Sequence, residues 1–349
     1  MSHGLCDKIP VRIPRARKQG RVGRENGNKR NKEGNMNEHH LTGFEGIVER
    51  AKAVERPMRV AIAAADAENI LRGAFMAQEA GFVEPILIGN EQKIRAVLEA
   101  IGETGRDVQV IDASGGDSSV QYAIEMINSG DADCLMRGNS STRDFLMPVL
   151  NKSNHLIVPD TLVTHINFLK IPGLERLVAV SDVTLLINPP VEARKQVIKN
   201  MVKALNAFDV EKPNIALLAL VEKPSYHMRD TVEDQTMVKE NRQRPFADCN
   251  LVGPIAYDLI VSKEAARLKG YDCPCCGEFD GIVVPNLATG NVMVKVLQQS
   301  AGATGFGVLV GARIPIAITS RSDAPEQSFY SLAACAAMWS APAYKKFFD

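Results

Sequence analysis

Two hydroxyls, a guanidinium and a carboxylate meet in the stretch SRSD, residues 320–323, which follows an apolar, β-branched run. A guanidinium at the end of a buried strand is costly to desolvate unless it pairs with an anion. Its planar fork suits phosphate and carboxylate groups. We therefore interpret Arg321 as an anion-binding residue with Ser320 beside it. Asp323 is the nearest carboxylate, and it is equally suited to cap the helix predicted to follow.

A second polar cluster, MRGNSSTRD at residues 136–144, stands between a predicted strand and a predicted helix. Free backbone N–H groups and hydroxyls at a helix N-terminus bind phosphate. Arg137, Gly138, Ser141 and Thr142 are therefore candidate substrate-binding residues. The alternative is that Ser141 or Thr142 only caps the helix.

The third cluster is PNLATGNVMVK, residues 285–295. Gly290 permits a close approach of the backbone, Asn291 is a candidate cap, and Lys295 lies one turn further along the predicted helix. We include all three as candidate substrate-binding residues. A capped helix that carries a surface lysine explains the same pattern.

Short apolar strands alternate with amphipathic helices from about residue 41 onward. Residues 59–66, 83–90 and 131–139 are predicted strands, and 69–81 and 91–102 are predicted helices. This alternation indicates an α/β fold with a parallel sheet that is covered on both faces. Ligands of such sheets bind outside the carboxyl ends of the strands, which is where the three polar clusters are expected to lie.

The 349 residues, 45% of them apolar, are enough for two ordinary cores. We expect one α/β lobe from residues 41–160 plus 325–349 and a second from 161–324. Residues 1–40 contain ten Lys or Arg and four Asp or Glu and lack hydrophobic periodicity, so they are predicted to be a disordered basic extension. No aromatic lies between their basic residues, so we expect no nucleic-acid partner.

Several classes of protein are disfavoured. No apolar run approaches the length of about 20 residues that a membrane helix needs. The motifs of P-loop NTPases, zinc proteases, serine esterases and dinucleotide-binding folds are all missing. Seven cysteines without regular spacing favour a reducing cytoplasm. Cys273, Cys275 and Cys276 lack a fourth ligand for structural zinc, so we expect no metal.

A set of motifs occurs in order between residues 45 and 337: LMRGNSST, IPGLERLVAVSD, GPIAYDLIVSKEAARLKGYDCP, IVVPNLATGNVMVKVLQ and ITSRSD. Together they resemble the phosphate acetyl- and butyryltransferases, most closely the butyryl branch. The resemblance implies two doubly wound lobes with a cleft between them, as in isocitrate and isopropylmalate dehydrogenases. It also implies the reversible reaction of a short-chain acyl-CoA with phosphate to give acyl phosphate and CoA, with CoA a substrate and no other cofactor. We further expect a homodimer or higher homo-oligomer.

The resemblance also implies roles for single residues. Arg321 would neutralise phosphate and developing charge, Ser320 would hydrogen-bond the sulfur or the oxyanion, and Thr142 with Ser141 would hold phosphate from the opposite lobe. Two positions depart from the family pattern. Gln327 replaces an Asp of acetyl-specific relatives that is thought to deprotonate CoA, and Arg137 replaces a Lys that is usual in butyryl-type relatives.

Two other functions remain open from the sequence. One is a non-catalytic CoA- or phosphate-binding module of the same fold. The other is a metal-dependent dehydrogenase that shares the fold and would need a group of Asp ligands across the cleft. Among the histidines, His165 within the strand-like LVTHINF is the first to inspect for a role.

Overall fold

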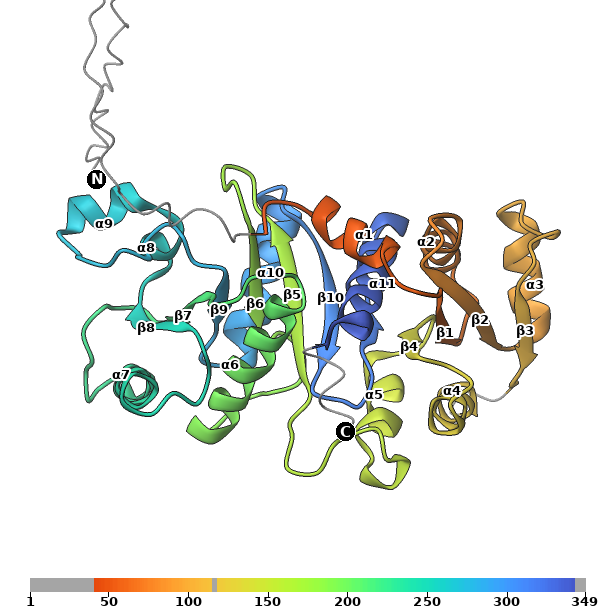
Figure 1. The fold of residues 1–349 in the computed structure, drawn as a ribbon, viewed down its shortest axis with the longest axis horizontal. Coiled ribbons are helices and arrows are strands. Elements are labelled where there is room, and N and C mark those ends of the chain that lie inside the picture. Colours follow the sequence, from red (N-terminus) through yellow and green to blue (C-terminus); the bar gives the residue numbers. More distant parts are fainter. Residues whose placement is uncertain (1–40, 115–117, 343–349) are drawn as a thin grey trace, which may run out of the picture. The chain divides into compact units, whose positions relative to one another are not determined.

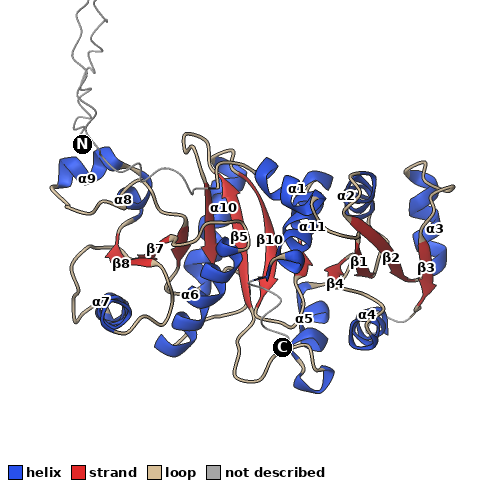
Figure 2. Ribbon diagram, in the orientation of Figure 1, coloured by secondary structure: helices blue, strands red, loops and turns tan. Residues whose placement is uncertain are grey.

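The computed structural model describes residues 41–114 and 118–342. The predicted basic extension, residues 1–40, lies outside the described residues. Eleven strands form one sheet in the order β3-β2-β1-β4-β11-β10-β5-β6-β9-β7-β8, and helices lie on both of its faces (Figures 1 and 2). The prediction of an α/β fold is confirmed.

The strands are β1 Met58–Ala63, β2 Val83–Gly89, β3 Gln109–Asp112, β4 Cys134–Arg137, β5 Thr164–Lys170, β6 Leu177–Ser181, β7 Asn214–Leu218, β8 Asn250–Ile255, β9 Gly281–Val283, β10 Thr304–Val310 and β11 Ile316–Ile318. The helices are α1 Phe44–Lys52, α2 Glu68–Glu79, α3 Glu91–Ala100, α4 Ser118–Ser129, α5 Thr142–Leu150, the 3₁₀ turn η1 Lys152–Asn154, α6 Val191–Asn206, α7 Arg229–Gln243, α8 Tyr257–Val261, α9 Lys263–Lys269, α10 Leu287–Ser300 and α11 Pro325–Ser340.

The centre of the sheet is antiparallel, so the prediction of a parallel sheet throughout is wrong. Strand β5 runs antiparallel to both β10 and β6, and β10 runs antiparallel to β11. The links at residues 171–176 and 311–315 are too short for the helical crossover that a parallel pair requires. The flanking strands are parallel, and their buried apolar runs reflect helices on both faces.

Two strand pairings bring distant segments of the chain together. Strand β11 lies parallel to β4, with Ile316 opposite Leu135, so the segments that follow the two strands emerge side by side. Strand β10 connects β11 to β5. One continuous sheet therefore passes through both predicted lobes, and the division into residues 41–160 plus 325–349 and 161–324 stays a prediction.

The described helices include none that is both long enough and apolar enough to cross a membrane.

Candidate functional site

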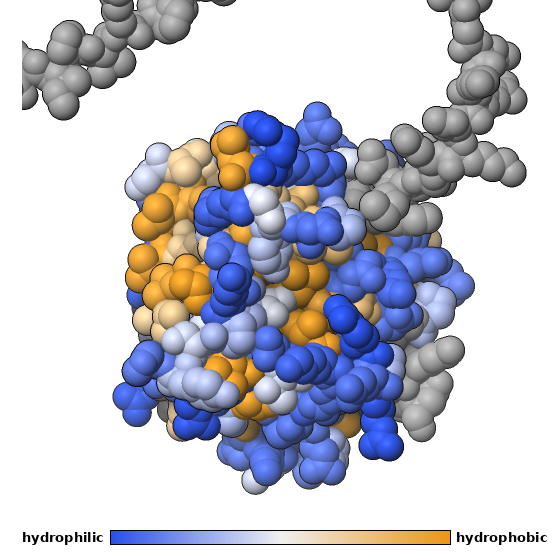
Figure 3. Space-filling view, turned by 90° about the vertical axis from the view of Figure 1, so that its left-hand side faces the viewer, coloured by the Kyte–Doolittle hydropathy of each residue, from blue (hydrophilic) through white to orange (hydrophobic). Residues whose placement is uncertain are grey.

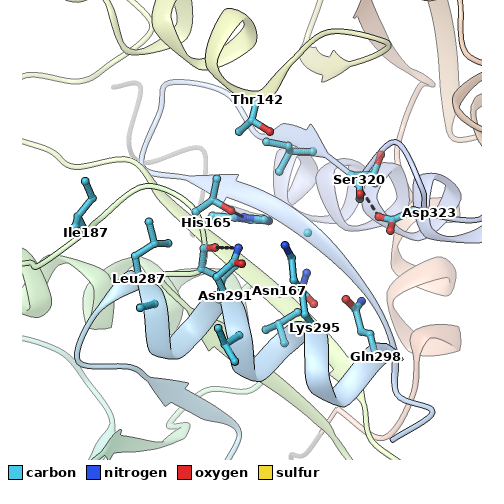
Figure 4. Close-up of a pocket in the computed structure, with 18 of the residues that line it drawn as sticks. Thr142, His165, Asn167, Ile187, Leu287, Asn291, Lys295, Gln298, Ser320 and Asp323 are labelled. Atoms are coloured by element: carbon cyan, nitrogen blue, oxygen red, sulfur yellow. Dashed lines mark hydrogen bonds between the residues drawn. The ribbon is translucent and has the colours of Figure 1, made fainter. Parts of the chain in front are cut away.

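A cavity of about 920 Å³ opens beside the ends of β4 and β11, above β5 and along α10 (Figure 4). One part of its wall is polar and another part is apolar. The polar residues include Arg137, Thr142, His165, Asn167, Asn291, Lys295, Gln298, Ser320 and Asp323, and the apolar ones Val183, Ile187, Leu287, Val292, Val294 and Ile318. Of the ten site residues predicted from the sequence, six line this cavity.

Arg137, the last residue of β4, is the buried cation of the cavity, with 5% of its surface exposed. Its Nη1 donates a hydrogen bond to Thr142 Oγ1 at 2.8 Å, whereas its Nε has no partner among the described residues. Burial lowers the pKa of Arg137, and the nearby charge of Arg321 lowers it further. An arginine stays protonated in proteins nonetheless, so the site holds an incompletely paired positive charge that favours an anion.

Arg321 differs from the expectation of a desolvated cation. It is exposed and is not among the residues that line the cavity. Within the described ranges it makes no ion pair or hydrogen bond, although it is close enough to Arg137 to affect its pKa. Strand β11 ends at Ile318, so the chain has already left the sheet when it reaches this residue. Arg137, and not Arg321, is therefore the desolvated guanidinium that requires an anion.

The turn after β11 is held by its own side chains. The Asp323 carboxylate accepts a hydrogen bond of 2.7 Å from the Ser320 backbone N–H, and the Ser320 and Ser322 hydroxyls lie 3.0 Å apart. Burial raises the pKa of Asp323, opposed by the Ser320 N–H and by Arg137. Figure 4 shows Ser320 and Asp323 at one end of the cavity.

The alternative role of Asp323 as a helix cap is wrong, because Ala324 is the N-cap of α11. The Gln327 side chain accepts a hydrogen bond of 2.8 Å from the Ala324 N–H and donates one of 3.0 Å to the Gly305 carbonyl of β10. Gln327 therefore ties the first turn of α11 to the sheet.

At the start of α5 the two hydroxyls have different surroundings. Ser141 is the N-cap, and its Oγ accepts a hydrogen bond of 3.1 Å from the Asp144 N–H. It lines a separate hollow of about 470 Å³, whereas Thr142 lines the main cavity. Gly138 is buried, and a Cβ there would lie 2.1 Å from the Ala64 carbonyl oxygen, so only glycine fits. The predicted phosphate contacts of Ser141 and Gly138 stay predictions.

On α10 the predicted cap is wrong. Asn286 caps the helix and accepts a hydrogen bond of 2.9 Å from the Thr289 N–H. Asn291 lies in the next turn, lines the cavity and donates to the Val183 carbonyl at 3.1 Å. Gly290 is buried against the loop that follows β6, since a Cβ there would meet the Asp182 carbonyl oxygen at 2.6 Å. Lys295 is exposed along the cavity wall.

Strand β5 supplies two cavity residues, His165 and Asn167, and only His165 was singled out from the sequence. They are two positions apart and share one face of the strand. The His165 Nε2 and the Asn167 Oδ1 are buried without a partner in the described part of the chain. The signal for Asn167 in the sequence is that two polar residues stand at alternate positions on either side of Ile166.

Comparison with protein families and curated proteins identifies the relatives of this chain. The model of the family described as phosphate acetyl/butaryl transferase matches residues 116–337. The chain belongs to this family. It is 29% identical over 290 residues to the phosphate acetyltransferase of Thermotoga maritima, covering 83% of this chain and 97% of that protein. It is 30% identical over 296 residues to the phosphate butyryltransferase of Clostridium acetobutylicum, covering 85% and 98%. Family membership makes the chain an enzyme of the phosphate acyltransferase type.

Solved structures confirm the fold expected of the family. A branched-chain phosphotransacylase from Enterococcus faecalis superposes with a TM-score of 0.72 at 23% identity, covering 82% of this chain and 99% of that one. A phosphotransacetylase from Streptococcus pyogenes gives 0.71 at 19% identity, covering 85% and 97%. A 4-hydroxythreonine-4-phosphate dehydrogenase from Klebsiella pneumoniae gives 0.50 at 11% identity, covering 80% and 99%, which shows the wider dehydrogenase-like fold.

Proposed function

We propose that the cavity binds a short-chain acyl-CoA together with inorganic phosphate and transfers the acyl group directly between them. The observation that carries this proposal is Arg137, a buried guanidinium with an unpaired Nε, beside the Thr142 hydroxyl at a helix N-terminus. Such a site favours a tetrahedral oxyanion with several acceptor atoms.

The phosphate would lie between Arg137 and Thr142, within reach of the turn at residues 320–323. Ser320 is exposed on the cavity wall, so its hydroxyl is available to a thioester sulfur. Arg321, exposed at the rim, would add positive charge to attract both anionic substrates. Support for these roles comes from the strand pairing of β11 with β4, which places the two segments side by side.

The acyl chain would occupy the apolar part of the cavity. Ile187 and Leu287 lie together at the end of the cavity remote from Ser320 and Asp323 (Figure 4). Lys295 and Gln298 line the opposite stretch of α10, where they suit the polar pantetheine arm and phosphates of CoA. An acetyl, propionyl or butyryl chain is proposed. All three are included because one methylene changes the free energy of binding by only about 1 to 3 kcal/mol.

Asp323 is proposed as the base that removes the proton of CoA in the reverse direction. Its carboxyl lines the cavity, and burial raises its pKa, which brings it nearer to the pKa of a thiol. Gln327 has no carboxylate and is engaged at both ends of its amide. It would therefore serve as a structural residue in this chain.

The decisive experiment is thiol release at pH 7 to 8 from acetyl-, propionyl-, butyryl- and isobutyryl-CoA, with and without phosphate and without added metal. Release that requires phosphate and yields acyl phosphate supports the proposal and ranks the acyl chains. Release without phosphate would indicate a thioesterase and overturn it. CoA binding without release would favour the non-catalytic module.

A metal-dependent dehydrogenase has less support. The described residues contain no group of three or more His, Cys, Asp or Glu side chains arranged to hold a metal ion. We propose no metal and no cofactor other than CoA as a substrate. The same assay separates this alternative, since a dehydrogenase would require a nicotinamide and would not consume phosphate.

We also propose a homodimer or higher homo-oligomer and a cytoplasmic location. Leu220 and Leu268, near β7 and in α9, are 84% and 71% exposed, and Figure 3 shows apolar surface at this end of the sheet. The six cysteines in the described ranges are free, as suits a reducing compartment. Light scattering of the purified chain and fractionation of cells would test the two statements.

A further inference from the structure

His165 occupies the floor of the cavity and has one nitrogen without a partner. The residue is 8% exposed and lines the cavity from the middle of the sheet. Its Nε2 is buried and makes no hydrogen bond to any described residue. A buried, unpaired ring nitrogen costs free energy, which a ligand in the cavity would recover.

The surroundings hold the imidazole in one orientation. Its Nδ1 lies 2.6 Å from Thr184 Oγ1, and its backbone N–H donates to Asp182 Oδ2 at 2.7 Å. On the other side lies Gly307 of β10, where a Cβ would stand 2.2 Å from Nε2. Glycine at position 307 is therefore required to leave room for the ring.

The hydrogen bond to Thr184 indicates which nitrogen carries the proton. In the described part of the chain the Thr184 hydroxyl has no other side-chain partner. If it donates to Nδ1, its proton is satisfied and Nε2 carries the hydrogen of the neutral ring. The opposite arrangement would leave both the hydroxyl proton and an Nε2 lone pair unsatisfied. The geometry therefore favours Nε2–H, a donor that has no partner among the described residues.

The ring stays neutral at physiological pH. Burial, with the charge of Arg137, lowers the pKa of His165 to about 3. A neutral imidazole donor can polarise a carbonyl without being consumed as an acid, whereas a group with so low a pKa is a poor base near pH 7.

The position of His165 fits the middle of an acyl-CoA. In Figure 4 the ring lies between the apolar pair Ile187 and Leu287 and the polar side chains Asn167 and Lys295. If the acyl chain of a thioester packs on Ile187 and Leu287, and its pantetheine arm lies along Asn167 and Lys295, its carbonyl group lies near the ring.

Resting on the proposed function, we propose that His165 is a catalytic residue whose neutral Nε2–H donates a hydrogen bond to the thioester carbonyl oxygen and stabilises the oxyanion. A phosphate oxygen attacks the carbonyl carbon, a C–O bond forms, and the carbonyl electron pair moves to the oxygen held by His165. The pair then returns, the C–S bond breaks, and the electrons leave on the CoA sulfur. Asp323 takes the proton of hydrogen phosphate and passes it to this sulfur, which is the reverse of its role as the base toward CoA. His165 keeps its proton throughout.

The kinetic test compares His165→Ala and His165→Gln with His227→Gln, a change at an exposed histidine outside the cavity. Loss of one oxyanion donor lowers kcat by about 10²- to 10³-fold. We expect His165→Ala to show this loss with little change in KM, and His165→Gln, which offers an amide donor, to recover part of it. Thr184→Val should lower kcat and Thr184→Ser should not. A kcat of His165→Ala within threefold of the wild type would overturn the proposal.

Two spectroscopic measurements keep the test valid if a variant folds poorly. The ¹⁵N spectrum of the wild-type enzyme should show His165 as the neutral Nε2–H form, and an Nδ1–H form would overturn the proposal. The infrared carbonyl stretch of a bound dethia-acyl-CoA ketone should lie lower in the wild type than in His165→Ala, which has no donor, and an equal frequency would overturn it. Wild-type enzyme that forms no acyl phosphate would instead overturn the proposed function.

Discussion

A charged side chain lies at each end of β4, and the two charges are compensated differently. At its start, Asp133 is largely buried, and both of its oxygens are paired with Arg56 and Arg59 at 2.7 to 3.1 Å. At its end, Arg137 is buried, and its Nε is unpaired within the described residues. A buried charge costs several kcal/mol unless it is compensated. The paired end is structural, and the unpaired end is where a substrate anion is expected.

The largest effect is expected from Arg137→Ala. Activity should fall by about 10²- to 10³-fold, since removal of a charge contact of this kind costs about 3 to 4 kcal/mol in the transition state. The free energy of unfolding should stay the same or rise, because an uncompensated buried charge is removed. Steady-state kinetics with varied phosphate and urea denaturation measure the two quantities. Severe destabilisation without a specific kinetic defect would show that Arg137 stabilises the fold and does not bind the substrate.

Asp133→Asn tests the other end of the strand. Burial alone would raise the pKa of Asp133, yet hydrogen bonds from Arg56 and Arg59 lower it to about 2 from 3.8. A carboxylate with a lowered pKa contributes stability above pH 4 that is lost as the pH falls toward 2. The variant should therefore lose about 2 kcal/mol at pH 7, should approach the wild type near pH 2, and should keep its activity. Urea denaturation across this pH range is the measurement. A drop in kcat would show that this ion pair also serves the site.

Arg321→Ala should have a smaller effect than Arg137→Ala, because Arg321 is exposed and screened by solvent. We expect about a tenfold loss of kcat/KM that shrinks at high salt. Kinetics at low and high ionic strength test this, with Arg313→Ala, another exposed arginine, as the control. A loss as large as that of Arg137→Ala and independent of salt would mean that Arg321 closes onto the substrate.

The smallest effect is expected from Gln327→Ala. Loss of the two hydrogen bonds that tie α11 to the sheet should cost about 1 kcal/mol of stability. Activity should change by less than threefold, as should that of Gln327→Asp. Thermal unfolding and the thiol-release assay measure both variants. A marked rise in activity for Gln327→Asp would show that a carboxylate at this position can act in this chain.

Local patterns were sufficient to predict the secondary structure around the site. The apolar runs that end at Arg137 and before Ser320 are strands, and each is followed by a helix as predicted. The helix caps were less predictable. Asp323 and Asn291 are sound caps by residue type, but Ala324 and Asn286 hold those positions. A cap depends on where the chain turns, and the contacts that set that turn come from neighbouring elements.

The sequence by itself determined the α/β class, the three polar clusters and the family, because alternating apolar periodicity and ordered motifs are local properties of the chain. Only the tertiary structure decided which arginine is buried, that β10 runs antiparallel to β5 and β11, and that His165 lines the cavity beside Gly307. These facts rest on pairings such as that of β11 with β4, between residues far apart in the chain. The burial and the hydrogen-bond partners of a side chain are set by the whole sheet, so they are not predictable from a stretch of ten residues.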